Sequence, residues 1–240
     1  VNENARISIL ERRSYVSFAN CGLPYYIGGD IKGKDALLLV TPELFENRFN
    51  IDVRLNHEVI DIDPKAKAVK VKYQEKVLTE SYDKLIVATG GTPIKPAIPG
   101  IELDGVTTLF TISDVEYIQK ELNKTKAAVI VGGGLIGLEM AEAMLKRGIK
   151  TTLVEMLPQV IPNYDPEFSL PVERHLREKG LEIILDKGVA AINGKDKVEE
   201  VRLSDGSSLK ADMVVMSIGV RPRIELAKKA GIAIGTSGGV

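Results

Sequence analysis

The stretch Gly132-Gly133-Gly134-Leu135-Ile136-Gly137 decides the fold of this chain, because it satisfies the pattern G-x-G-x-x-G. It directly follows a short apolar run, Ala128 to Val131, and it opens an amphipathic run that reaches Arg147. In that context Gly132 permits a tight turn, Gly134 lets a pyrophosphate approach the backbone, and Gly137 permits close packing of helix on strand. The sequence therefore predicts a strand–turn–helix unit that binds a dinucleotide at the positive end of the helix.

An acidic residue stands at the distance from this loop that dinucleotide binding requires. Glu155 lies 23 residues after Gly132, at the end of the apolar run Thr151 to Val154, where its carboxylate can bond the hydroxyls of a ribose. No Lys or Arg lies between Glu155 and Arg174. A 2′-phosphate would therefore meet a carboxylate without a cation nearby in sequence, which favours NADH over NADPH.

Short apolar runs alternate with helical periodicity along the chain, as is typical of α/β proteins with a parallel sheet. The strand candidates are Arg6 to Leu10, Leu85 to Thr89, Ala128 to Val131, Thr151 to Val154 and Met213 to Ser217. Ser113 and Glu116 form the pattern of a capping box for a helix from Asp114 to Leu122. Further helix signals are the start Asp165-Pro166 and the stops Gly148, Gly180 and Gly231.

An internal repeat is visible in the flanks of two strand candidates. Asp83, Gly90 and Pro93 recur as Asp212, Gly219 and Pro222 at one constant offset. Each group follows a stretch of alternating apolar and polar residues. The earlier runs Arg6 to Leu10 and Thr151 to Val154 are each followed directly by a glutamate. We interpret the chain as two copies of one α/β unit.

The first copy is incomplete. Glu11 corresponds to Glu155, and the same spacing would place the first glycine loop upstream of Val1. The fold class that we expect is therefore α/β, with two Rossmann-like dinucleotide-binding units of which the first lacks its beginning. Redox proteins with paired units of this kind commonly hold a flavin on the first and a nicotinamide on the second. The alternative is that Glu11 is a solvated residue at a strand end.

Composition excludes several classes of function. The 240 residues carry 32 Lys and Arg against 33 Asp and Glu, with 5% aromatic residues, so the chain lacks the positive field that general nucleic-acid binding needs. The longest uncharged apolar run, Ala127 to Leu138, is too short to span a membrane. One cysteine and two histidines exclude an intrachain disulfide, a redox pair of cysteines and a histidine metal cluster.

The single cysteine, Cys21, is a candidate for redox chemistry. Pro24 is a natural first-turn residue and Gly28-Gly29 a natural stop, so we expect Cys21 at or just before the start of a short helix, where the helix dipole favours thiolate. A lone thiol can accept electrons by forming a mixed disulfide with a small thiol or by passing through sulfenic acid. The alternative is a small buried apolar residue.

These motifs together resemble a known family. Ser17-Phe18-Ala19-Asn20-Cys21-Gly22-Leu23-Pro24-Tyr25 resembles the single-cysteine motif of the pyridine nucleotide-disulfide oxidoreductases, in the branch of coenzyme A-disulfide reductases and NADH oxidases or peroxidases. Ala88-Thr89-Gly90, the second glycine loop with Gly137-Leu138-Glu139, and Ser217 to Pro222 follow in the family's order. Asn20, Leu23 and Pro24 look more like the coenzyme A-disulfide reductases.

The resemblance implies FAD on the first unit and NAD(P)H on the second. It implies that Cys21 is catalytic and that the flavin contacts are Glu11, Ser17, Ala88, Thr89 and Gly90. It implies that the nicotinamide cofactor contacts are Gly132, Gly134, Gly137, Glu139, Glu155 and Gly219. The implied substrate is a small disulfide such as coenzyme A disulfide, and the parent protein is implied to be a cytoplasmic homodimer without a metal. An oxidase or peroxidase with a cysteine sulfenate and a non-catalytic NAD-binding module are the alternatives.

The chain also departs from the family pattern. The first glycine loop, the second flavin motif ending in Gly-Asp and the C-terminal dimerisation domain are absent from these residues, and Ile112-Ser113 stands where many relatives carry an arginine. Pro171 interrupts a helical run, so we expect that helix to begin later than in relatives. The expected domains are a partial FAD-binding domain at 1–110, an NAD(P)H-binding domain at 111–224 and the start of a return to the first domain at 225–240.

Overall fold

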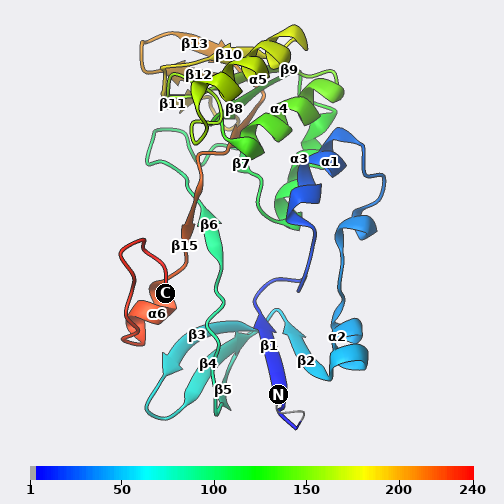
Figure 1. The fold of residues 1–240 in the computed structure, drawn as a ribbon, viewed down its shortest axis with the longest axis vertical. Coiled ribbons are helices and arrows are strands. Elements are labelled where there is room, and N and C mark those ends of the chain that lie inside the picture. The colour runs from blue at the N-terminus through cyan, green and yellow to red at the C-terminus, as the bar shows by residue number, and fades with distance from the viewer. Residues whose placement is uncertain (1–3) are drawn as a thin grey trace. The chain divides into compact units, whose positions relative to one another are not determined.

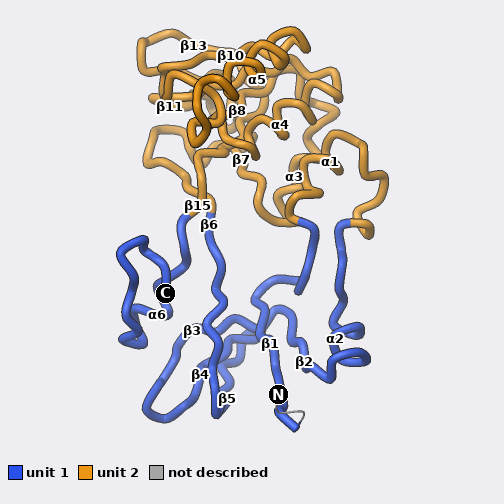
Figure 2. The backbone as a smooth tube through the Cα atoms, viewed as in Figure 1, with its two compact units in different colours: residues 1–19, 37–92, 221–240 blue, residues 20–36, 93–220 orange. Residues whose placement is uncertain are grey.

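The computed structural model describes residues 4–240, which divide into two compact units (Figure 2). Unit 1 comprises residues 1–19, 37–92 and 221–240, and unit 2 comprises residues 20–36 and 93–220. Neither unit is one continuous stretch of chain. The expected division into an FAD domain and an NAD(P)H domain by residue number stays a prediction.

Unit 2 is built on a five-stranded parallel sheet with the strand order β10-β9-β8-β14-β7 (Figure 1). The strands are β7 (Val106–Thr108), β8 (Ala127–Val131), β9 (Lys150–Val154), β10 (Glu182–Ile184) and β14 (Met213–Met216). Chain order runs outward from β8 to β9 on one side and reaches β14 on the other, so the sheet has a topological switch point between β8 and β14. Ligands of open α/β sheets bind in the crevice at such a point, at the carboxyl ends of the strands.

Helices and a second sheet complete unit 2. The helices are α1 (Leu23–Gly28), α3 (Ile112–Leu122), α4 (Leu135–Lys146) and α5 (Pro166–Glu178), and a 3-10 turn (Asn20–Gly22) precedes α1. The second sheet is antiparallel and consists of β11 (Val189–Asn193), β12 (Glu200–Leu203) and β13 (Ser208–Lys210). Buried aliphatic side chains from β8, β9, β14 and β12 form one core, which makes the parallel sheet a rigid base for the loops at its edge.

Unit 1 contains shorter sheets. The parallel pair is β1 (Ile7–Glu11) with β2 (Ile51–Leu55), and the antiparallel sheet is β3 (Glu58–Asp63), β4 (Ala68–Tyr73) and β5 (Lys76–Ser81). The helices are α2 (Pro42–Phe49) and α6 (Glu225–Lys229), and a second 3-10 turn spans Lys34–Leu37 at the boundary of the units. The remaining strands, β6 (Gly91–Pro93) and β15 (Val220–Pro222), pair with each other, and each has residues in both units.

The predicted repeat is visible in the structure. Both units carry a three-stranded antiparallel sheet, and each sheet has a register shift in its first strand, between Val59 and Asp61 in one and between Val189 and Ala191 in the other. The two glutamates that end a parallel strand also make the same bond. The Glu11 carboxylate accepts the backbone N–H two residues on at 2.8 Å, and the Glu155 carboxylate does so at 2.9 Å. The α/β fold with two related units is therefore confirmed.

The prediction of a strand at Leu85 to Thr89 is wrong. These residues form no strand in the structure, and the side chains of Leu85 and Ile86 are 39% and 88% exposed. Their counterpart β14 lies between β8 and β7 and bonds to both. A strand requires neighbours for its backbone N–H and C=O groups, and within residues 4–240 no strand pairs with this segment.

Two details of the helix predictions also need correction. The capping box of α3 is formed by Thr111 and Asp114, not by Ser113 and Glu116, because the helix begins two residues earlier than predicted. Pro171 does not delay α5, which begins at Pro166 and runs through it. A proline in the second turn costs one backbone hydrogen bond, and α5 tolerates it. The predicted stops are confirmed, since Gly148, Gly180 and Gly231 follow their helices with positive φ angles of 74°, 92° and 73°.

Candidate functional site

The glycine loop joins β8 to α4 as predicted, and its geometry requires glycine at two positions. Gly132 has a φ of 108°, and a Cβ there would lie 2.5 Å from the carbonyl oxygen of Ser217. A Cβ on Gly137 would lie 1.9 Å from the carbonyl oxygen of Gly132. These contacts close the turn from strand to helix and bring the helix against the strand. Larger residues at either position would push the loop open.

Gly134 serves a different purpose. It is the N-cap of α4, no side chain caps the helix there, and a Cβ on it would meet no atom within 4 Å. The first N–H groups of α4 therefore face open space, where they can donate to an anion. These residues fit the pyrophosphate of a dinucleotide.

Glu155 lies directly after β9 and reaches back to this loop. Its carboxylate accepts the backbone N–H of Gly133 at 2.6 Å and that of Leu157 at 2.9 Å, and the residue is 7% exposed. A carboxylate has about four acceptor positions, so two remain for the hydroxyls of a ribose. The structure places Glu155 beside the glycine loop, as the spacing predicts.

The carboxyl end of β14 completes the crevice. Ser217 follows β14, its backbone N–H bonds Val131, and its hydroxyl is the one buried side-chain polar atom among the described residues with no hydrogen-bond partner. Gly219, two residues on, has a φ of 107° and accepts the N–H of Ile94 at 2.9 Å. The carboxyl end of β14 thus carries a buried hydroxyl that the described residues leave without a partner.

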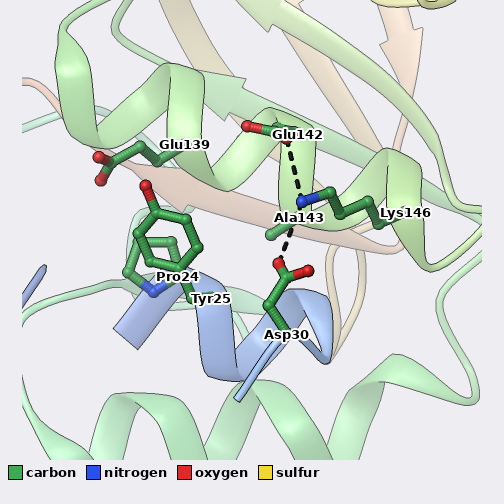
Figure 3. Close-up of a pocket in the computed structure, with 7 residues that line it drawn as sticks. All are labelled: Pro24, Tyr25, Asp30, Glu139, Glu142, Ala143 and Lys146. Carbon is green, nitrogen blue, oxygen red and sulfur yellow. Dashed lines mark hydrogen bonds and ion pairs between the residues drawn. The ribbon is translucent and has the colours of Figure 1, made fainter. Parts of the chain in front are cut away.

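The Cys21 thiol is exposed in the 3-10 turn that directly precedes α1. The helix α1 packs on α4, and the two run parallel: Pro24 and Tyr25 line one small pocket with Glu139, and Gly28 lies against Ala143 one turn further along both helices (Figure 3). The cysteine turn and the glycine loop therefore lie at the same end of a packed helix pair.

Glu139, on α4, is a partly buried carboxylate with a raised pKa. Burial, and secondly the negative charge of Glu142, raise the pKa of Glu139 above its ordinary value. Its carboxylate lies beside the Tyr25 ring, and no ion pair to it is described within residues 4–240 (Figure 3). The helix α4 therefore presents a carboxyl group that holds its proton more tightly than a solvated one would.

The residues predicted to contact a flavin lie in unit 1. The Glu11 carboxylate accepts the N–H of Arg13, and no second partner for it is described within residues 4–240. Thr89 donates its hydroxyl to the carbonyl of Arg223 at 2.6 Å, and Gly90 has a φ of 64°. Ser17 is half-buried, and Ala88 is exposed. The Glu11 carboxylate thus keeps free acceptor positions. The role of these residues at a flavin stays a prediction.

Clusters of metal-ligating side chains and membrane-spanning helices are both absent from the described residues. Within residues 4–240 no group of His, Cys, Asp and Glu side chains could hold a metal ion. No helix in this range is long and apolar enough to cross a bilayer.

Sequence reasoning missed several residues of the site. Asp30, Lys146 and Arg147 join α1 to α4, and no local pattern marks them, because each partner is more than a hundred residues away in the chain. The unpartnered hydroxyl of Ser217 is likewise visible only in the folded chain.

Comparison with known proteins identifies the relatives. A protein named NADH oxidase from Methanocaldococcus jannaschii is 41% identical over 238 residues, covering 98% of this chain and 53% of that protein. A CoA-dependent NAD(P)H sulfur oxidoreductase from Pyrococcus abyssi is 36% identical over 239 residues, covering 98% of this chain and 52% of that protein. The chain spans about half the length of the curated relatives that it matches.

A solved structure gives the same result. Reduced Bacillus anthracis CoADR-RHD superposes with a TM-score of 0.95 at 41% identity, covering 99% of this chain and 43% of that one. The family model of the pyridine nucleotide-disulphide oxidoreductases matches residues 1–240, so it spans both units and the cysteine turn. The chain therefore belongs to the pyridine nucleotide-disulphide oxidoreductase family.

Proposed function

We propose that the protein containing this chain carries electrons from NAD(P)H through FAD and Cys21 to a small disulfide or persulfide such as coenzyme A disulfide. The observation that carries the proposal is the packing of α1 on α4, which sets an exposed thiol and a dinucleotide loop at one end of a helix pair. The name of the P. abyssi relative, a CoA-dependent NAD(P)H sulfur oxidoreductase, supports the substrate class.

The residues of the chain divide the work. The loop from Gly132 to Gly137 and Glu155 hold the nicotinamide dinucleotide, and Glu139 lies further along α4 beside Tyr25. FAD, when bound, supplies the two-electron relay, for which Glu11 offers a ribose-binding carboxylate.

Cys21 acts on the substrate. Its thiolate attacks one sulfur of the disulfide, the S–S bond breaks, and the other half leaves as a thiolate that takes a proton from solvent, with a mixed disulfide left on Cys21. The two electrons and the proton that NAD(P)H gives up as a hydride then release the second thiol and restore the Cys21 thiolate.

The test is an assay of the purified protein with NADH and coenzyme A disulfide. We expect turnover in the wild type and at least a ~100-fold loss in Cys21→Ser, because serine forms no mixed disulfide. A rate unaffected by Cys21→Ser would overturn the thiol mechanism.

The second candidate is an oxidase or peroxidase that uses a Cys21 sulfenate. The 41% identity to the NADH oxidase of M. jannaschii favours it. An assay with NADH and peroxide as the electron acceptor, followed by a sulfenate-specific reagent, separates the two, because only the second candidate couples NADH oxidation to the reduction of a Cys21 sulfenate. The homodimeric state and the cytoplasmic location of the parent protein stay predictions.

A further inference from the structure

The cysteine helix is held to the dinucleotide-binding helix at its C-terminal end. Arg147, the C-cap residue of α4, donates from Nε to the carbonyl oxygen of Ile27 in α1 at 2.6 Å. Its guanidinium also lies over Gly29, where a Cβ would come within 3.3 Å of it. The neighbouring Lys146 lies 3.0 Å from Asp30 and 3.0 Å from Glu142 (Figure 3).

The two cations do not hold α1 equally well. The side chains of Lys146 and its partners are 41–55% exposed, so water and salt weaken that pair. The bond from Arg147 to Ile27 is partly buried, and it gives a helix-terminal carbonyl a charged partner. Of the two cations, Arg147 is therefore the stronger tether of α1, and Gln119 of α3 adds an uncharged hydrogen bond to the carbonyl of Tyr26 at 3.1 Å.

The tether fixes the register of a parallel helix pair. Gly28 lies against Ala143, and counting back the same number of residues along each helix places Cys21 near the level of Ile136 in the first turn of α4. Sliding α1 along α4 by one residue would move Cys21 by about 1.5 Å. A displacement of about 1 Å can cost ~100-fold in rate when two groups have to meet.

We propose that Arg147 is a positioning residue, which sets the place of Cys21 relative to the glycine loop by holding the carbonyl end of α1 against α4. Its significance for electron transfer rests on the proposed function. The placement itself does not, because it follows from contacts within unit 2.

The experiment compares Arg147→Gln with the wild-type protein. Two quantities are measured: the rate at which iodoacetamide alkylates Cys21, followed by mass spectrometry of the peptide that contains it, and kcat and KM for NADH. We expect the alkylation rate to change about fivefold or more and kcat to fall about tenfold, with KM within about twofold. Arg147→Lys keeps the charge and should recover part of both.

The matched control is Arg177→Gln, which removes an arginine that pairs with Glu173 within α5. It should leave both quantities unchanged. The proposal is overturned if Arg147→Gln alkylates like the wild type, or if its KM rises in step with the loss of kcat, as general loosening of unit 2 would cause. Turnover that survives Cys21→Ser would instead refute the proposed function, and the alkylation rates would still decide the role of Arg147.

Discussion

At the scale of single residues, Glu155 is the residue that we expect to discriminate between NADH and NADPH. The nearest cation by backbone contact, Lys187, bonds Glu155 through its main chain but directs its ammonium to Asp205 at 2.6 Å. That ammonium, and secondly Ser207, hold the pKa of Asp205 far below its usual range. Lys150 begins β9 while Glu155 follows its end, about 16 Å away along the strand. Neither Lys187 nor Lys150 therefore places a positive charge where it would neutralise a 2′-phosphate beside Glu155.

From this geometry we expect NADH to bind more tightly than NADPH, and Glu155→Ala to narrow the difference by about tenfold. Titration of both cofactors against both proteins measures it. Glu182→Ala is the control, since Glu182 bonds Thr152 on the neighbouring strand and does not touch the glycine loop. A preference of the wild type for NADPH would contradict the charge argument.

Glu139 gives a prediction about stability and pH. Its pKa is raised in the folded protein, so the folded state binds its proton more tightly than the unfolded chain does. The free energy of unfolding therefore falls as pH rises from the ordinary carboxyl range through the raised pKa. Glu139→Gln should be more stable than the wild type at pH 7, and this gain should vanish at about pH 4. Denaturant unfolding at both pH values measures it, and a gain that persists at the lower pH would show another cause.

At the scale of elements, the start of α3 separates a sequence pattern from the cap that actually forms. Thr111 accepts the N–H of Asp114, whose carboxylate accepts the N–H of Thr111 in return, whereas Ser113 lies inside the helix. We expect Thr111→Ala to lower the free energy of unfolding by about 1 kcal/mol and Ser113→Ala to change it by less than about half as much. Denaturant unfolding of both variants tests this. Equal decreases in the free energy of unfolding would contradict Thr111 as the residue that caps the helix.

Strands were predictable from sequence where the described residues supply strands that pair with them. The runs that became β8, β9 and β14 find neighbours on both sides, so their apolar pattern was a sufficient guide. Leu85 to Thr89 has the same pattern but pairs with no strand within residues 4–240. The glycine loop and Glu155 were predictable because local spacing fixes them. Ser217 and Arg147 were not, since their roles depend on contacts between distant segments.

At the scale of the whole molecule, unit 1 depends on the last twenty residues of the chain. Leu226 and Ala230, in and just after α6, pack on the core formed by Ile62, Val69 and Val71, and Lys229 lies 3.0 Å from Asp61. We expect Leu226→Ala to lower the stability of unit 1 by about 1–2 kcal/mol, because a partly buried leucine loses its packing. In Leu226→Ala, amide hydrogen exchange should accelerate in β4 and stay unchanged in β8. The control variant Lys228→Ala should leave exchange unchanged in both strands. Equal acceleration in both strands would show that the two units unfold together.

The division of each unit into separated segments has a consequence for synthesis on the ribosome. Segments 1–19 and 37–92 of unit 1 are synthesised before residues 93–220 and its segment 221–240 after them, whereas the segments of unit 2 are complete at residue 220. Since compact units fold when all their parts are present, unit 2 can fold first although unit 1 begins earlier. While 93–220 is translated, the core of Ile62, Val69 and Val71 therefore lacks its contacts with Leu226 and Ala230 and is packed only by residues made earlier, such as Leu10 and Tyr82.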